Sequence, residues 1–286
     1  MFAQAEAENF PVATRLLPRD VRAHLMALYG FARLTDDIGD EADGDRSAQL
    51  DWLEDELVRA AEGTATHPVL QRLSPTLRDL DLSLQPFRDL IEANRLDQVV
   101  HRYETFDDLV GYCMLSAAPV GRLVLGVFGA GTPERVALSD DVCIALQVVE
   151  HLQDVGEDAA HDRIYLPRAD LVAEGCTGAE LRADHAGPGL RRVVAREVAR
   201  ARVLLASGPA LAATLPPRPR LAVAGFAAGG HAALDAIERA GHDVLGARCR
   251  PRPARFGARL AGVLARSVTA PRPRPAARPV AVAERA

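Results

Sequence analysis

The stretch VVEHLQDVGEDAAHDRIYLP, residues 148–167, combines apolar residues with closely spaced carboxylates. Glu150, Asp154 and Asp158 stand four residues apart, which is close to one helical turn, so a helix would place them on one face. Carboxylates stacked on a partly apolar face repel one another and are costly to desolvate unless a positive charge lies between them. A divalent cation bound to this helical face is one explanation of the spacing, and an acidic face in open solvent is the other.

The remainder of the chain also shows helical periodicity. Strand signals are nearly absent, because aromatic residues make up only 5% of the sequence and long period-two alternations are missing. The predicted helices cover residues 19–38, 47–62, 76–95, 106–116, 119–129, 133–160, 188–214 and 221–247, with a break at LPPRPR, residues 215–220. The pattern predicts an all-α protein in which residues 1–250 form a single domain.

Composition excludes several classes of protein. The chain has 286 residues, 48% of them hydrophobic, which suits one large domain or two small ones. The net charge of −5 gives no reason to expect nucleic acid as a partner, and the four Cys fit neither a zinc spacing nor a dense disulfide framework. We find no basic-then-apolar leader and no apolar run of 18 residues. We therefore expect a soluble cytoplasmic protein.

Residues 251–286 differ from the rest, because they form a basic tail rich in Pro and Arg. From Gly246 to the end of the chain there are ten Arg and one Glu. Residues 253–266 place apolar side chains against Arg at helical spacing. This pattern is typical of an amphipathic helix that lies on an anionic membrane, which here would be the inner face of the cell membrane. The alternative is a terminal helix that packs on the domain. Residues 267–286 are predicted to be disordered.

A second acidic stretch, YGFARLTDDIGDE, occupies residues 29–41. Tyr29, Arg33, Asp36 and Asp40 are spaced by four, three and four residues, which predicts one helical seam. Carboxylates at a helix C-terminus are unfavourable because the helix dipole is negative there. A purely solvated acidic end is therefore the weaker interpretation.

The two acidic stretches can face each other across a helical bundle. Facing carboxylate pairs can hold Mg²⁺, which prefers oxygen ligands and keeps waters or substrate phosphates. Arg33 and Arg163 suit diphosphate oxygens, because a guanidinium donates paired hydrogen bonds.

At this point the sequence resembles a known family. DDIGD and DVGED resemble the two Asp-rich motifs of the squalene and phytoene synthases, and the flanking YGFAR and DRIYLP are also similar to that family. The resemblance extends to about residue 250. The stretches ENFPVATRLLP (8–18), SAAPVGRLVLGVFG (116–129) and GGHAALDAIERAGHDVL (229–245) resemble its HpnC-type branch, the hydroxysqualene synthases of bacterial hopanoid biosynthesis.

The resemblance implies an isoprenoid-synthase helical bundle around a central cavity, with Mg²⁺ and presqualene diphosphate. The implied metal ligands are Asp36, Asp40, Asp154 and Asp158. The residues that match positions lining the diphosphate region or its flap are Tyr29, Arg33, Gln147, Arg163 and Tyr165. Glu150 stands where the family usually has Asn, so it either binds a metal ion or marks a changed cation arrangement. Enzymes of the same pathway are expected partners.

The chemistry of such a site needs a dry cavity. A carbocation formed by loss of diphosphate would be quenched early by water unless apolar side chains enclose it. Phe31, Tyr112 and Phe226 are candidates to face the cation, with plain core packing as the alternative for each. Pro119 is predicted to divide a helix, where a freed carbonyl can orient a water, and Gly121 permits close approach.

We predict Mg²⁺-dependent conversion of presqualene diphosphate to hydroxysqualene, with water as the final nucleophile. No glycine-rich dinucleotide fingerprint follows a strand, so no NADPH is expected. The nearest alternative is condensation of two prenyl diphosphates on the same fold. A non-catalytic interaction protein is an alternative of a different class, and retention of all four motif Asp argues against it. A metal phosphohydrolase using His151, His161 and Asp162 is a weaker alternative still.

Overall fold

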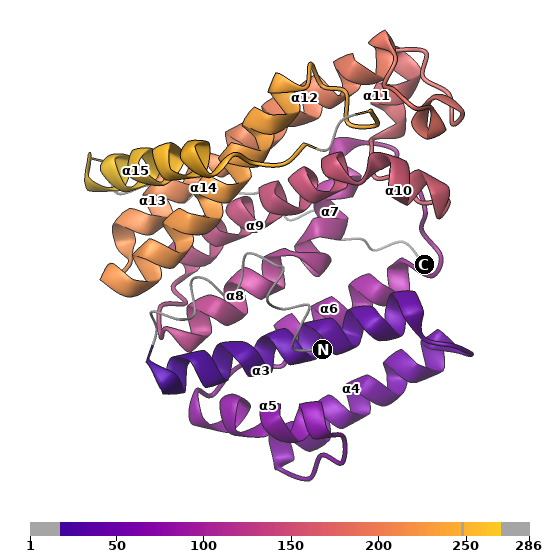
Figure 1. The fold of residues 1–286 in the computed structure, drawn as a ribbon. Coiled ribbons are helices and arrows are strands. Elements are labelled where there is room, and N and C mark those ends of the chain that lie inside the picture. The colour runs from indigo at the N-terminus through magenta and orange to yellow at the C-terminus, as the bar shows by residue number, and fades with distance from the viewer. Residues whose placement is uncertain (1–17, 247–248, 270–286) are drawn as a thin grey trace.

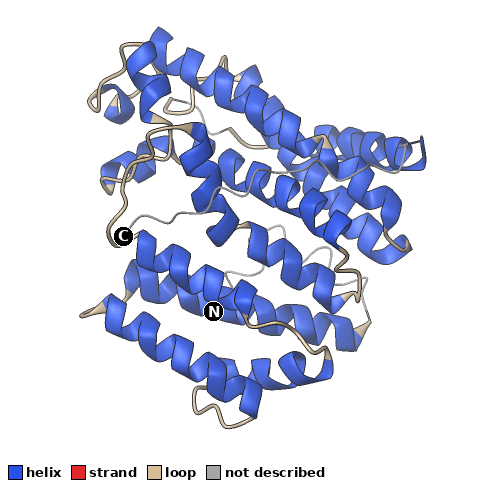
Figure 2. Cartoon of the chain, turned by 180° about the vertical axis from the view of Figure 1, so that it is seen from behind, coloured by secondary structure: helices blue, strands red, loops and turns tan. Residues whose placement is uncertain are grey.

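The structure is a computed structural model that describes residues 18–246 and 249–269. Within these ranges the elements are helices joined by loops, without a named strand (Figure 2). Arg102 and Ile164 form an isolated backbone bridge. The predicted all-α fold is confirmed.

The N-terminal half contributes one layer of the molecule and one core (Figure 1). Its elements are α3 (Arg19–Asp36), the π-helix η1 (Asp37–Glu41), α4 (Arg46–Glu62), α5 (Pro68–Asp79) and α6 (Gln85–Leu96). Phe31 and Phe87 meet edge to face at its centre, with ring centroids 5.0 Å apart. Leucines from α4 and α5 surround them, fully buried.

The C-terminal half contains the larger core, built around the central helix α9. Its elements are α7 (Phe106–Ser116), α8 (Ala118–Val127), α9 (Pro133–Gln153), α10 (Val155–Ala160), α11 (Arg168–Ala173), the 3₁₀ turn η2 (Glu180–Arg182), α12 (Pro188–Leu205), α13 (Ser207–Thr214), α14 (Pro217–Arg239) and α15 (Pro253–Thr269). Helices α8, α12, α13 and α14 all contact α9 (Figure 1). The central helix is therefore held in place by its neighbours in the C-terminal half.

Local sequence explains where several helices begin. Thr105 caps α7 and forms a reciprocal capping box with Asp108, and Thr132 caps α9. Pro68, Pro133 and several other prolines occupy first-turn positions, where the missing N–H removes no helical hydrogen bond.

Three predicted helices differ from the structure. The segment predicted over 76–95 is two helices, because the chain turns after α5 at Asp81, whose φ is +47°, and Pro86 begins the next helix. The segment predicted over 188–214 divides at Ala206, ahead of Gly208 and Pro209. The segment predicted over 133–160 divides at Asp154, a difference that shapes the site below.

The predicted break at 215–220 is wrong in its extent, because α14 begins at Pro217 and continues through it. That helix ends at Arg239 rather than 247. Gly241, at φ +63°, adopts the left-handed conformation that commonly terminates helices.

The predicted basic helix is present as α15 and extends to Thr269, so residues 267–269 are helical rather than disordered. It lies across α13 and α14 (Figure 1). Val263 is fully buried, and Arg259 pairs with Asp235 at 2.8 Å. The apolar side of the helix therefore packs on the domain. The rest of the tail, from residue 270, lies outside the described residues, as does most of the stretch 8–18.

By length and composition alone, Phe106–Val127 is long and apolar enough to cross a membrane, a candidate that the sequence reading did not identify. The segment breaks at Ala117, ahead of Pro119, as predicted for that proline. Its two pieces, α7 and α8, lie between α6 and α9. This arrangement is typical of core helices in a protein interior.

Candidate active site

A cavity of about 320 Å³ contains both acidic segments in its wall. The lining residues are Asp36, Asp40, Leu90, Ala93, Asn94, Asp97, Tyr112, Ser116, Gln147, Glu150, His151, Asp154, Asp158, Arg163 and Tyr165. They come from the end of α3 and η1, from α6, α7, α9 and α10, and from the loop after α10. Six of them are carboxylates and one is Arg, so the cavity strongly favours a positively charged occupant.

The first acidic segment is not a regular α-helix. Helix α3 ends at Asp36 and continues as the π-helix η1, which shifts the side-chain register. Asp36 and Asp40 line the cavity. Arg33 instead forms ion pairs with Asp37 at 2.8 Å and Glu41 at 3.3 Å. The predicted single face is therefore divided: Asp36 and Asp40 line the cavity, whereas Arg33 pairs with acids outside its lining.

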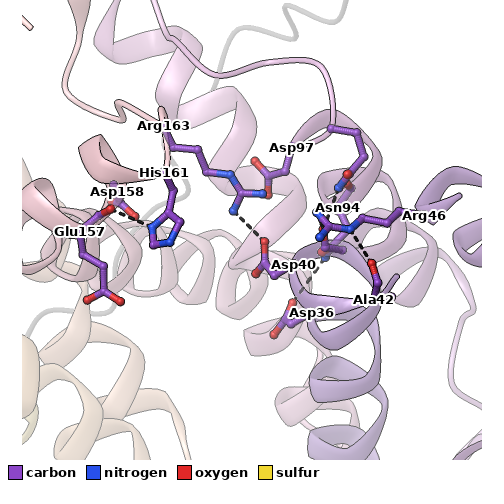
Figure 3. Close-up of polar contacts among 12 residues, drawn as sticks. Asp36, Asp40, Ala42, Arg46, Asn94, Asp97, Glu157, Asp158, His161 and Arg163 are labelled. Carbon is purple, nitrogen blue, oxygen red and sulfur yellow. Dashed lines mark hydrogen bonds and ion pairs between the residues drawn. The ribbon is translucent and has the colours of Figure 1, made fainter. Parts of the chain in front are cut away.

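Gly39 allows this turn to lie close to α6. A Cβ atom at this position would fall 1.9 Å from Oδ1 of Asn94. The amide of Asn94 in turn donates to Oδ1 of Asp36 at 3.4 Å (Figure 3). Gln98 donates to the carbonyl of Gly39 at 3.0 Å. Steric contact with Asn94 therefore explains why the DDIGD motif has a glycine at position 39. The hydrogen bond from Asn94 on α6 also helps to hold the Asp36 side chain in place.

The second acidic segment crosses a helix break. Helix α9 ends at Gln153, and Asp154 is the residue between it and α10. The backbone N–H of Asp154 still bonds to Glu150 at 3.0 Å, and that of Asp158 to Asp154 at 2.8 Å. The one-turn spacing of the three acids is therefore preserved, and all three line the cavity.

Arg163 connects the two segments. Its Nη1 donates to Oδ1 of Asp40 at 2.7 Å (Figure 3). The backbone holds the loop, since the N–H of Arg163 bonds to Asp158 and that of Ile164 to His101. Burial is the largest single effect and opposes the charged form of Arg163, but the hydrogen bond and charge of Asp40, together with Tyr165 and Asp97, outweigh it and raise the pKa of Arg163.

An aromatic group surrounds the buried Asp97 on one side of the cavity. The hydroxyl of Tyr112 donates to Asp97 at 2.7 Å, and that of Tyr165 lies 3.5 Å from its other oxygen. The ring of His151 stacks on Tyr165 at 3.7 Å. Burial is the main reason that the pKa of Asp97 rises to about 6, against the opposing hydrogen bond from Tyr112.

The two acidic segments are electrostatically strained. Burial, with the charge of Asp40, raises the pKa of Asp36 to about 6 despite the hydrogen bond from Asn94. Burial, followed by the charge of Asp154, raises the pKa of Asp158 to about 7. A bound cation would relieve both effects, because it stabilises the ionised carboxylates.

The side chains that line the cavity suit a Mg²⁺ ion that is bound jointly by carboxylates and by the phosphates of a ligand. Among residues 18–246 and 249–269, no three His, Cys, Asp or Glu side chains converge closely enough to bind a metal ion alone. The lining acids offer only oxygen ligands, which suit Mg²⁺, and this ion commonly uses one or two carboxylates with phosphates and waters. The site fits a metal that arrives with a phosphorylated ligand better than a closed structural metal site.

Most of the predicted site residues come together. Those that line the cavity are Asp36, Asp40, Gln147, Glu150, Asp154, Asp158, Arg163 and Tyr165, and the candidate aromatic Tyr112 joins them. Tyr29 and Arg33 lie on α3 outside the lining. Of the residues of the phosphohydrolase alternative, only His151 reaches the cavity, while Asp162 pairs with Arg102 at 2.6 Å.

The remaining four predicted residues lie elsewhere. Phe31 is in the N-terminal core, so plain core packing describes it, and Phe226 is half-buried on α14. Pro119 is buried in the first turn of α8. Gly121 faces α9, where a Cβ would fall 2.3 Å from Oγ of Ser139. The structure gives them packing positions, and their proposed roles at the substrate stay predictions.

Sequence reasoning missed Asn94, Asp97 and Ser116. Asn94 lies on the buried face of α6 four residues after Leu90, and Asp97, also buried, directly follows the helix three residues later. A polar residue on an otherwise apolar helical face was the available signal, because burial of a polar group needs a partner.

Comparisons with known proteins agree with this geometry. The sequence profile described as "Squalene/phytoene synthase" matches residues 3–255. A hydroxysqualene synthase of Zymomonas mobilis is 38% identical over 201 residues, covering 69% of this chain and 67% of the relative. A phytoene synthase of Arthrospira platensis is 33% identical over 261 residues, covering 85% and 83%.

This chain is also similar in fold and sequence to a protein of known structure. The crystal structure of squalene synthase HpnC from Alicyclobacillus acidocaldarius matches with a TM-score of 0.79 and 47% identity, covering 84% of this chain and 91% of that chain. The matched profile spans both acidic segments and every residue that lines the cavity. The chain therefore belongs to the squalene/phytoene synthase family and is an enzyme of that family.

Proposed function

We propose that this enzyme converts presqualene diphosphate and water into hydroxysqualene and diphosphate, with Mg²⁺ as its cofactor. The observation that carries the proposal is the cavity itself, in which two carboxylate segments face each other with Arg163 between them. Its relatives named hydroxysqualene synthase support the choice of reaction.

Asp36 and Asp40 on one wall, and Asp154 and Asp158 on the other, would hold the metal. Bound there, Mg²⁺ supplies Lewis-acid neutralisation of the diphosphate charge. Glu150 is the further oxygen donor of the second wall.

The chain's own residues have distinct tasks. Arg163 would donate hydrogen bonds to diphosphate oxygens, a role that its partly buried guanidinium fits. Tyr112 and Tyr165 hold Asp97 and form an aromatic wall. Leu90 and Ala93 contribute apolar surface, which limits the access of water to a reactive cation.

We expect water to be the final nucleophile and expect no requirement for NADPH. The alternative is condensation of two prenyl diphosphates, and the similarity to a phytoene synthase over 85% of this chain favours keeping it in the test. The same carboxylates would serve either reaction, because both begin with loss of diphosphate from a prenyl group.

The test is incubation of the purified enzyme and Mg²⁺ with presqualene diphosphate or with farnesyl diphosphate, each with and without NADPH. Hydroxysqualene from presqualene diphosphate alone supports the proposal, while turnover of farnesyl diphosphate alone replaces it with the condensing alternative. Asp36→Asn and Asp154→Asn should each lower turnover about a hundredfold, or about 2.7 kcal/mol. Asp79→Asn, an exposed acid on α5, is the matched control.

A further inference from the structure

Ser116 is the last residue of α7 and lines the cavity. Its Oγ is inaccessible to solvent and has no hydrogen-bond partner among the described residues. Tyr112, one turn earlier, also lines the cavity, but its hydroxyl is bound to Asp97. Ser116 is therefore a residue of the cavity wall whose hydroxyl has unused hydrogen-bonding capacity.

The unused hydroxyl has no role in the helix itself. Helical Ser and Thr usually bond back to the carbonyl four residues earlier, as Ser74 does to Leu70 at 3.0 Å and Thr35 to Phe31 at 2.9 Å. Ser116 makes no such bond. Leaving a buried hydroxyl unpaired costs about 1–3 kcal/mol, and Ala is a better helix former. Stability thus favours Ala at this position, so a ligand is the physical reason for a hydroxyl.

Gln147 supplies a second polar group from α9, in the wall of the same cavity. Its amide nitrogen lies 3.4 Å from Nε2 of His151. A serine hydroxyl both donates and accepts, and an amide oxygen accepts. Two to four such groups are what an ordered water needs, and the lining of the same cavity also includes the apolar Leu90 and Ala93.

We propose that Ser116, after a rotation about χ1 that turns its covered hydroxyl toward the cavity, acts together with Gln147 to position the water that captures the carbocation formed from presqualene diphosphate. The inference rests on the proposed function. In that step an oxygen lone pair of water forms the C–O bond, and the resulting oxonium loses one proton. The departing diphosphate, a base generated by the ionisation, accepts that proton. Ser116 keeps its own proton at the end of the step.

Without a positioned water, the carbocation can instead lose a proton. A neighbouring C–H bond can break to form a double bond, its proton again passing to diphosphate, which gives a hydrocarbon instead of an alcohol. The sensitive measurement is therefore the ratio of alcohol to hydrocarbon, which is independent of overall turnover. Removing one hydrogen bond to water should lower that ratio roughly threefold to tenfold in Ser116→Ala.

The experiment compares the products of wild type, Ser116→Ala, Ser116→Cys and Ser116→Thr from presqualene diphosphate and Mg²⁺. Ser116→Thr keeps the hydroxyl and should restore the ratio, and Ser116→Cys tests its loss at nearly constant volume. Ser74→Ala, which removes a helical hydroxyl outside the cavity, should leave the ratio unchanged.

The outcomes distinguish failure of the proposed role of Ser116 from failure of the proposed reaction. A lower ratio in Ala and Cys with recovery in Thr supports the role of Ser116. An unchanged ratio, even with lower turnover, makes Ser116 structural and overturns the inference while the proposed function stands. Absence of any alcohol from the wild-type enzyme overturns both.

Discussion

The guanidinium of Arg163 lies 2.7 Å from a carboxylate oxygen of Asp40, a residue 123 positions earlier in the chain. The pair joins opposite walls of the cavity (Figure 3). Both side chains are partly exposed, so the pair contributes only about 0–1 kcal/mol to stability. Its consequence is functional, because it keeps a guanidinium beside the acids where a diphosphate would bind.

We therefore predict that Arg163→Gln raises KM for presqualene diphosphate about tenfold to a hundredfold, the range expected for a lost charged hydrogen bond. Arg163→Lys should recover part of the loss, because it keeps the charge without the paired donors. Steady-state assays of diphosphate release measure the effect. Arg168→Gln, which breaks an exposed pair with Glu104, is the control, and equal KM values in both variants would contradict the prediction.

Gly39→Ala should destabilise the enzyme by about 1–3 kcal/mol, because the new methyl group collides with the side chain of Asn94. Urea unfolding measures the change. Gly111→Ala, at a helical position with open space around it, should instead stabilise by up to about 1 kcal/mol.

A double variant separates this collision from a general effect of alanine. Asn94→Ala removes the colliding atoms, so Gly39→Ala should cost much less in that background. Additive changes in the free energy of unfolding would place the strain elsewhere.

Much of the site could be predicted from the sequence, because a motif on one helical face remains on one face when the helix folds. The second acidic segment shows why, since Glu150, Asp154 and Asp158 keep their one-turn spacing even across the break at Asp154. The first segment shows the limit. The π-helix after Asp36 was not predicted, and Arg33 pairs with Asp37 one turn later and with Glu41 instead of facing the cavity with Asp36 and Asp40.

Residues outside the motifs were harder to find, for a physical reason. Asn94 matters because it touches Gly39 and Asp36, contacts made by the approach of two helices far apart in sequence. Periodicity describes a single helix and carries no information about such approaches. Helix boundaries at Asp81 and Ala206 likewise depend on turn geometry and tertiary packing.

Asp97 should make stability depend on pH. Its pKa in the folded enzyme is about 6, above the usual 3.8, mainly because burial disfavours its charge. The folded state therefore holds the proton more tightly, and stability falls as pH rises from 3.8 through 6. We predict that Asp97→Asn raises Tm, relative to wild type, more at pH 7.5 than at pH 4.5 in metal-free buffer. The exposed Asp55→Asn should show no such difference, and a pH-independent effect at Asp97 would contradict the prediction.

We propose that α15 attaches the enzyme to the cytoplasmic face of a membrane. Its exposed arginines can be changed to test this attachment. Truncation would expose the partners of the buried Val263, so charge reversal is the cleaner change. Arg255 and Arg266 are exposed, and each is worth about 1 kcal/mol near an anionic surface. Arg255→Glu with Arg266→Glu should weaken binding to phosphatidylserine vesicles at least tenfold. The same double reversal at Arg72 and Arg78 on α5 is the control, and equal binding by both proteins would remove α15 from the contact.

Glu150 gives the most specific prediction about the metal. It lies one turn before Asp154 and lines the cavity. Three ionised acids in successive turns repel one another by roughly 0.2–0.5 kcal/mol per neighbouring pair, and a bound cation reverses that sign. Glu150→Asn keeps a carbonyl oxygen but loses one negative charge, so activity should persist at a higher Mg²⁺ concentration. Glu150→Leu offers no oxygen and should lose most activity at any Mg²⁺ concentration. Magnesium titrations of turnover that coincide for wild type, Asn and Leu would place the Glu150 carboxylate outside the metal site.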